Sequence, residues 1–262
     1  MINNSTGVEE WAFLPKEMYG MQYNLSQDVD GAHAFGMDNT VSFWVRDNNR
    51  DGVIDPTTDK VFMFVSMRRG GRNIYAFDAT PTSIMTAQTA TVTPKLMWVI
   101  EGGQGDFAKL GQTWSVPRIT RIRYKCSGAV CNDGNPDTSD TKSRVVLIFA
   151  GGYDVNQDNG IPAGTDTMGN AIYIVDPFTG ARIWWASDAN ATLNLTKMKY
   201  SIPSDLTMLD TDRDSTVDRL YVGDTAGQIW RIDLGTQLEA GVLDVGTKGY
   251  VFADVGCGST SS

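Results

Sequence analysis

The fold is decided by residues 218–233, which read DRLYVGDTAGQIWRID. Two runs rich in β-branched and aromatic residues, Arg219–Val222 and Gln228–Asp233, flank a turn that contains two glycines. Short apolar runs bounded by glycine and aspartate are typical of β-strands. The stretch therefore predicts two strands joined by a turn, with an aspartate at the end of the second strand.

The same order of parts occurs three times along the chain. The strands after the glycine turn read IYAFD at Ile74–Asp78, IYIVD at Ile172–Asp176 and IWRID at Ile229–Asp233, and their alternation places one face in a core. In each copy a strand, a loop and a second strand precede the turn, and a further strand follows. This internal repeat predicts strands at Val41–Arg46, Lys60–Met67, Asn73–Asp78 and Pro94–Ile100, at Val116–Tyr124, Arg144–Ala150, Ala171–Asp176 and Ala181–Ala186, and at Pro203–Leu209, Arg219–Val222, Gln228–Asp233 and Gly249–Asp254.

Four strands that recur in this way are typical of the blades of a β-propeller. We therefore expect an all-β domain over residues 1–262, with blades near residues 41–100, 115–187 and 203–254. Glu10–Leu14 resembles the outer strand of a preceding blade. Because propellers close with four to eight blades and open sheet edges promote aggregation, we expect an incomplete arc that belongs to a larger polypeptide.

The composition is that of an acidic globular protein. Of the 262 residues, 41% are hydrophobic, and 31 acidic against 22 basic side chains give a net charge of −9. This charge repels phosphate backbones, so we expect no nucleic-acid partner. No apolar run reaches the roughly 18–20 residues that a membrane-spanning helix requires. The single histidine, His33, excludes histidine-pair mechanisms and metal sites built from several histidines.

Four carboxylates share one nine-residue loop between two predicted strands. They follow the pattern D-x-D-x-D-x-x-x-D, at Asp210, Asp212, Asp214 and Asp218. Two unit charges about 4 Å apart repel by roughly 4 kcal/mol at an effective dielectric constant near 20, so the carboxylates converge favourably only around a cation. Calcium, which takes six to eight oxygen ligands in flexible geometry, suits the pattern.

The same spacing occurs in the equivalent loop of the first repeat. Its candidate ligands are Asp47, Asn49, Asp51 and Asp55, and Gly52 lies where a sharp turn is required. Neither loop is a complete EF-hand, because the twelfth positions are Thr58 and Tyr221 instead of glutamate. The alternative is an acidic hairpin loop that stays solvated. A third acidic run, Asp154–Asp158, lacks an acid at the ninth position and is interpreted as an ordinary loop.

In the second repeat the corresponding position holds two cysteines. The spacing of Cys126 and Cys131 permits a local disulfide, which would restrain a long insertion. The alternative is a pair of free thiols in a reducing compartment. Cys257 has no evident partner, so it is either free or paired outside this chain.

Several of these motifs resemble the C-terminal propeller of the PilY family. They are MRRGGRNIYAFDAT at 67–80, LGQTWSVP at 110–117, IFAGGYD at 148–154, YSIPSDLT at 200–207 and the stretch 218–233. The resemblance covers most of residues 9–234. It implies a quinoprotein-like β-propeller from a type IV pilus biogenesis factor and tip-associated adhesin. The calcium ligands of the family correspond to Asp210, Asp212, Asp214 and Asp218, and the first loop matches with Asn49 in place of one aspartate.

From the resemblance we expect a noncatalytic, calcium-binding module that regulates pilus extension, retraction and surface attachment. Its partners would be pilin and minor pilin components, and a host or abiotic surface. Its location would be extracellular or at the cell surface, at the pilus tip or associated with the outer membrane. The alternative is a quinone (PQQ)-dependent dehydrogenase, because Asp176-x-x-Thr179-Gly180-x-x-x-Trp184 resembles the blade motif of that superfamily. The lack of adjacent cysteines and the short arc oppose this alternative.

Overall fold

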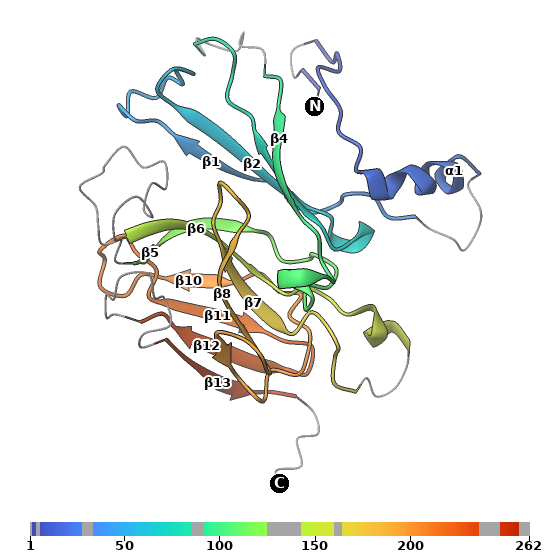
Figure 1. Ribbon diagram of the computed structural model, residues 1–262, viewed down its shortest axis with the longest axis vertical. Coiled ribbons are helices and arrows are strands. Elements are labelled where there is room, and N and C mark those ends of the chain that lie inside the picture. Colours follow the sequence, from blue (N-terminus) through green and yellow to red (C-terminus); the bar gives the residue numbers. More distant parts are fainter. Residues whose placement is uncertain are drawn as a thin grey trace.

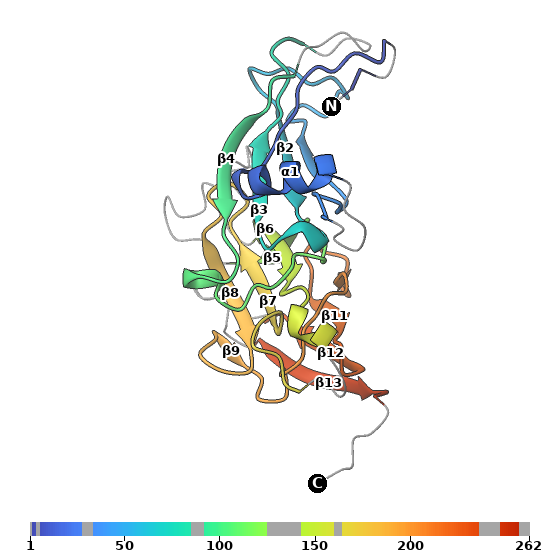
Figure 2. The same ribbon diagram turned by 90° about the vertical axis from the view of Figure 1, so that its right-hand side faces the viewer.

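The structure, a computed structural model, describes residues 2–3, 6–27, 34–84, 92–124, 143–159, 164–235 and 247–256. These residues form three β-sheets in chain order, which are antiparallel apart from one short parallel pair, with short helical turns between strands. The sheets follow one another along the long axis of the molecule (Figures 1 and 2). We name them blade 1, blade 2 and blade 3. The all-β propeller expectation and the three-blade arc are confirmed.

Each blade is a meander of four strands. The strands of blade 1 are β1 (Ser42–Arg46), β2 (Lys60–Ser66), β3 (Ile74–Asp78) and β4 (Lys95–Ile100). Those of blade 2 are β5 (Arg118–Arg123), β6 (Ser143–Ala150), β7 (Ala171–Val175) and β8 (Arg182–Ser187), and those of blade 3 are β10 (Thr207–Leu209), β11 (Arg219–Gly223), β12 (Gln228–Asp233) and β13 (Lys248–Asp254). All twelve predicted strands are present, with ends shifted by a few residues.

One strand of blade 2 was not predicted from the sequence. β9 (Leu193–Asn194) pairs in parallel with the end of β8 and makes the sheet five-stranded. Parallel pairing after a short connection leaves no alternating pattern long enough to identify. The remaining helical elements of the described residues are the helix α1 (Tyr19–Gln27) and turns of 3₁₀ helix at Lys16–Met18, Arg68–Gly70, Gly105–Phe107 and Val155–Asn159.

The blades are held together by apolar clusters between their faces. Blade 2 is buried on both sides: Ile148 and Ile174 face a cluster shared with blade 3, whereas Phe149 and Tyr173 face a cluster shared with blade 1. Because successive side chains of a strand point to opposite faces, a strand packed on both sides must be apolar at every position. β6 and β7 are accordingly almost continuously apolar, and β7 is buried throughout.

The other face of blade 1 is covered by the N-terminal segment, and one expectation is corrected here. Residues 10–14 belong to none of the sheets of the described residues, so Glu10–Leu14 is not an outer strand. Instead Phe13 packs edge-on against Tyr75 and Phe77, at centroid distances of 5.2 and 4.8 Å. Trp11 and Met18 join the same cluster. The alternation of Glu10–Leu14 arises from packing on a sheet face, not from pairing at a sheet edge.

None of the helices in the described ranges is long and apolar enough to cross a membrane.

Candidate metal centre

The acidic loop of blade 3, residues 210–218, connects β10 to β11. Its base is closed by the pairing of Leu209 with Arg219 and by the backbone N–H of Asp218, which donates to the Leu209 carbonyl at 2.8 Å. Val217, which is 8% exposed, packs in the core between blades 2 and 3, and its N–H donates to the Arg121 carbonyl of β5. The loop is therefore anchored to blade 2 at its base while its acidic tip faces outward.

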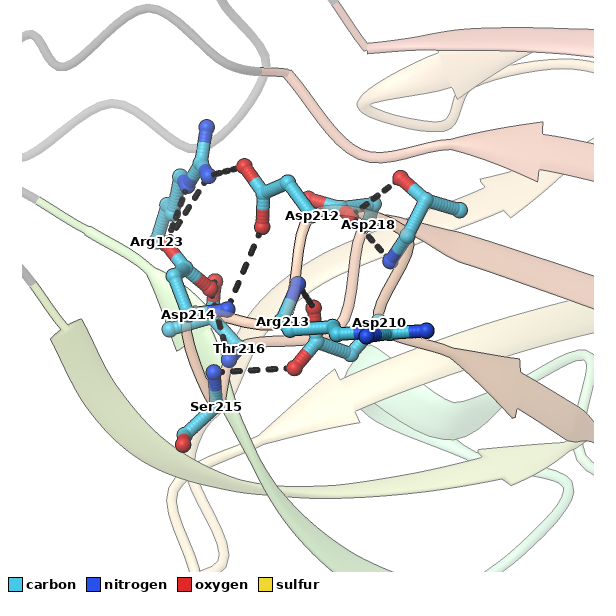
Figure 3. Close-up of polar contacts among 9 residues, drawn as sticks. Arg123, Asp210, Asp212, Arg213, Asp214, Ser215, Thr216 and Asp218 are labelled. Atoms are coloured by element: carbon cyan, nitrogen blue, oxygen red, sulfur yellow. Dashed lines mark hydrogen bonds and ion pairs between the residues drawn. The ribbon is translucent and has the colours of Figure 1, made fainter.

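The tip of the loop is folded around the carboxylate of Asp210. Its Oδ1 accepts the backbone N–H of Arg213 at 2.6 Å, and its Oδ2 accepts that of Ser215 at 2.8 Å (Figure 3). The chain reverses at Arg213 and Ser215, which adopt positive φ angles of 65° and 71°. Each carboxylate oxygen keeps a second lone pair, so these backbone bonds orient Asp210 without saturating it.

Three of the predicted ligands converge. Asp210, Asp212 and Asp218 each place a carboxylate oxygen within 4.8 Å of those of the other two. Calcium–oxygen distances of about 2.3–2.6 Å put two ligands of one ion at most about 5 Å apart, so the three oxygens fit a calcium ion. Asp218 is buried, and its Oδ2 accepts the N–H and the hydroxyl of Thr211 at 2.7 and 2.6 Å.

The fourth predicted ligand, Asp214, is held apart from this group by an arginine. Its Oδ1 accepts the N–H and hydroxyl of Thr216, and its Oδ2 accepts Nε of Arg123 at 2.9 Å. Arg123 also donates to Asp212 from Nη2 (Figure 3). Burial raises the pKa of Asp214, but the Thr216 and Arg123 hydrogen bonds outweigh it and hold that pKa below its ordinary value. The carboxylate is therefore charged at neutral pH.

The acidic loop of blade 1, which connects β1 to β2, has the same framework. Asp47 accepts the N–H groups of Arg50 and Gly52, at 2.7 and 2.8 Å, as Asp210 accepts those of Arg213 and Ser215. Asp51 accepts the N–H of Val53 at 2.8 Å, as Asp214 accepts that of Thr216. Positive φ angles recur at the same two positions, 60° at Arg50 and 78° at Gly52. Two loops distant in sequence therefore adopt one conformation.

At the end of the first loop, the structure places Asp59 where the second loop has Asp218. Asp59 is fully buried, directly precedes β2, and accepts the N–H of Asn48 just as Asp218 accepts that of Thr211. Backbone N–H groups of Asn48 and Asp55 lower the pKa of Asp59. The predicted ligand Asp55 instead accepts the N–H and hydroxyl of Thr57. The first loop has four more residues before its second strand than the second loop, so a search with a fixed nine-residue spacing does not find Asp59.

The third acidic run is organised around a buried carboxylate. Asp154 is 1% exposed; its Oδ1 accepts the N–H of Asn156, and its Oδ2 accepts the N–H and hydroxyl of Thr167 and the N–H of Met168. Asp158, at the other end of the run, accepts the hydroxyl of Tyr153. The two carboxylates thus form hydrogen bonds that stabilise the loop after β6.

The motif that suggested a quinone-dependent enzyme forms the turn between β7 and β8. Asp176 accepts the N–H groups of Phe178 and Thr179, Gly180 adopts a φ of 72°, and Trp184 is fully buried. Every residue of the motif thus has a structural task within the blade. The candidate disulfide Cys126–Cys131, Cys257 and His33 lie outside the described residues.

Three successive sheets, each built on a meander of four antiparallel strands, pack face to face. Two of them carry an acidic hairpin loop between their first two strands, and this arrangement defines part of a β-propeller. The family model of the PilY1 beta-propeller domain matches residues 21–244. The chain therefore belongs to the PilY1 β-propeller family.

Two relatives place this assignment in context. The chain is 23% identical over 240 residues to the type IV pilus biogenesis factor PilY1 of Pseudomonas aeruginosa (strain UCBPP-PA14), in a match that spans 89% of this chain and 16% of that protein. The crystal structure of the P. aeruginosa PilY1 C-terminal domain is similar with a TM-score of 0.56 and 18% identity, over 93% of this chain and 40% of that one. The chain thus corresponds to a small part of the full relative.

Proposed function

We propose that this chain is a noncatalytic, calcium-binding propeller module of a type IV pilus biogenesis factor. The observation that carries the proposal is the convergence of carboxylate oxygens of Asp210, Asp212 and Asp218 to within 4.8 Å of one another. The loop that brings them together is shaped by the backbone bonds to Asp210 and by the positive φ angles of Arg213 and Ser215. Like charges held this close repel, and a hard divalent cation with oxygen ligands relieves the repulsion. The ion would be held by Asp210, Asp212 and Asp218, with Asp214 available after release from Arg123.

The equivalent loop of blade 1 is the second proposed calcium site. Asp47, Asn49 and Asp51 repeat the spacing of the first three carboxylates, and Asp59 takes the position of Asp218. We propose Asp59, in addition to the predicted Asp55, as a candidate ligand. This loop carries one carboxylate fewer among its first three positions, so we expect weaker binding than in blade 3.

Calorimetric titration of the chelator-treated chain with calcium tests the proposal. We expect saturable binding with a dissociation constant of about 10⁻⁶–10⁻³ M, which covers the extracellular range and the weaker part of the sensor range, and a rise in the unfolding temperature. Asp210→Asn should abolish the tighter phase, whereas Asp158→Asn, which removes a comparably exposed aspartate from the third run, should not. An unchanged unfolding temperature in millimolar calcium, with no binding heat, would contradict the proposal.

The proposal for the cellular role is supported by the family and by the name of the curated relative, a type IV pilus biogenesis factor. We propose that the full polypeptide acts at the cell surface, where it is located at the pilus tip or associated with the outer membrane. It would contact pilin and minor pilins and regulate pilus extension, retraction and attachment. Pili sheared from cells that make the full polypeptide should carry it, and crosslinking should join it to a pilin. Its recovery from the cytoplasm alone would contradict this role.

The noncatalytic assignment is also a proposal, supported by the structural use of the Asp176–Trp184 motif within blade 2. The visible absorbance spectrum of the purified full polypeptide tests it. We expect no quinone band, and a stoichiometric band would favour the dehydrogenase alternative instead.

A further inference from the structure

The acidic loop of blade 3 already contains a positive charge supplied by the protein. Arg123 is the last residue of β5 in blade 2 and lies 89 and 91 residues from its partners Asp212 and Asp214. Its Nε and Nη2 atoms lie 2.9 and 2.8 Å from the same Asp214 oxygen, and Nη2 also contacts Asp212 (Figure 3). The arginine side chain is only 21% exposed. One guanidinium therefore bridges two adjacent carboxylates.

The loop of blade 1 shows why this arginine is needed. There the residue that matches Asp212 is Asn49, and its amide Nδ2 donates to Asp51 at 2.9 Å. In the loop of blade 1, the carboxylate of Asp51 is thus held by the Asn49 side chain of the same loop. In blade 3 the same two positions are both aspartates, which repel each other. Arg123 supplies from a neighbouring blade the positive charge that Asn49 makes unnecessary.

Arg123 and a metal ion would use the same carboxylates. The Asp212 carboxylate that converges with Asp210 and Asp218 is also a partner of the guanidinium. Asp214 has Oδ1 bonded to Thr216 and Oδ2 bonded to Arg123, so it can turn toward an ion only by leaving the arginine. The Asp210 carboxylate differs, because its bonds come from backbone groups of the loop itself.

We propose that Arg123 is an internal counter-cation that competes with calcium for Asp212 and Asp214, so that calcium binding releases the tip of the blade 3 loop from blade 2. This inference rests on the proposed calcium binding. The base of the loop stays attached in both states through Val217, whose N–H donates to the Arg121 carbonyl and whose side chain is in the shared core. Calcium would thereby be coupled to a contact between two blades, not only to the shape of one hairpin.

Calcium titration of Arg123→Gln tests the competition. Removing the guanidinium leaves Asp212 and Asp214 uncompensated in the calcium-free chain. We therefore expect calcium affinity to rise about tenfold, since the loss of one charge interaction of about 1.4 kcal/mol changes a binding constant by that factor. The unfolding temperature in chelator should fall below that of the unchanged chain, and the two should approach each other in saturating calcium. Arg123→Lys keeps the positive charge but loses the planar guanidinium that contacts both carboxylates. The calcium affinity of this variant should lie between those of the unchanged chain and Arg123→Gln.

Arg182→Gln is the matched control. Arg182, on β8 of blade 2, pairs at 2.8 Å with Asp106, which lies in the 3₁₀ turn after blade 1. Its side chain is 22% exposed, close to the value for Arg123. Because it lies at the other blade interface, its loss should leave calcium affinity within about twofold of the unchanged chain. A tenfold rise for both variants would mean a general effect of net charge and would overturn the specific role of Arg123.

A second measurement observes the arginine directly. In ¹⁵N-edited NMR spectra, the Nε–H signal that disappears in Arg123→Gln should move toward the position of a solvated arginine as calcium saturates the chain. If Arg123→Gln binds calcium no more tightly than the unchanged chain, or the signal stays in place at saturation, while Asp210→Asn abolishes binding, the competition is refuted and calcium binding stands. If the unchanged chain itself binds no calcium, the proposed function and this inference both fail.

Discussion

Ser215 and Gly52 occupy equivalent positions in the two acidic loops, but the backbone conformation is strained only at the serine. Ser215 and Gly52 both adopt φ angles above 70°, a region in which a side chain is strained and glycine is not. We expect Ser215→Gly to raise the free energy of unfolding by about 0.5–1 kcal/mol, the strain relieved minus the entropy gained by the unfolded chain. Urea denaturation measures the change.

Gly52→Ala is the reverse experiment in the matched loop. A Cβ at Gly52 would meet nothing within 4 Å, so only backbone strain opposes it. We expect a loss of about 0.5–1 kcal/mol. Equal signs for the two substitutions would show that the two loops do not share the conformation described above.

The buried carboxylate of Asp154 should make stability depend on pH. Burial raises the pKa of Asp154. The hydrogen bonds from the N–H groups of Asn156, Thr167 and Met168 and from the Thr167 hydroxyl lower it by more, so the folded-state pKa lies below the ordinary value. A depressed folded-state pKa gives stability that is fully present above the unfolded pKa of about 3.9 and is lost as pH falls through the folded one. We expect Asp154→Asn to cost about 2 kcal/mol at pH 7, measured by urea denaturation.

The same measurement near pH 3 gives the decisive contrast. There the difference between Asp154→Asn and the unchanged chain should shrink, because the unchanged chain loses its own carboxylate contribution. Asp158→Asn, at the exposed end of the same run, should change stability little at either pH. A penalty for Asp154→Asn that is equal at pH 3 and pH 7 would contradict the assigned role of the charge.

The sequence predicted those residues of the candidate site that a regular local spacing identifies. Asp210, Asp212 and Asp218 converge as their pattern predicts. Asp59 was missed because its spacing from Asp47 includes four inserted residues; a search for an aspartate directly before the second strand would have found it. Arg123 was missed because the pairing of a β5 residue with the loop is a property of blade packing, which a local pattern does not contain.

At the scale of elements, the repeat predicted all twelve meander strands, because glycine turns and alternating runs are local signals. The error at Glu10–Leu14 has a physical reason. Alternation reports that one side of a segment is buried, and it does not report whether the backbone pairs with a neighbour. The Trp11 and Phe13 side chains pack against the cluster on blade 1, although residues 10–14 belong to none of the sheets of the described residues.

This packing predicts a stabilising role for the N-terminal segment. Phe13→Ala removes two edge-on aromatic contacts, with Tyr75 and Phe77, from a partly buried site. We expect a loss of about 1–2 kcal/mol in the free energy of unfolding, measured by urea denaturation. Leu14→Ala is the control. The Leu14 side chain, next to Phe13 in the sequence, is 43% exposed, so its removal should cost less than about 0.5 kcal/mol. Equal losses for both variants would contradict the packing of one face only.

At the scale of the whole molecule, the burial of successive blades differs. Blade 2 has both faces covered and blade 1 has the N-terminal segment on its second face, whereas blade 3 shares only one face with a neighbour among the described residues. Its outward side chains include Leu209, Tyr250 and Phe252, which are 41, 45 and 61% exposed. The order of the blades could be predicted from the repeat, but this asymmetry could not, because it depends on which segments fold back onto the arc.

The outward face of blade 3 should cause the isolated chain to self-associate. Tyr221 and Phe252 pack edge-on at 5.5 Å and form an aromatic group on this face, and exposed apolar patches on a sheet promote association. Sedimentation velocity over a hundredfold range of concentration should show a rising sedimentation coefficient, and Phe252→Ser should restore a concentration-independent monomer. Val8→Ser, at a residue that is also 61% exposed but lies near the N-terminus, should leave the association unchanged. A chain that remains monomeric throughout, or one in which both variants act alike, would mean that this face is not the surface that drives association.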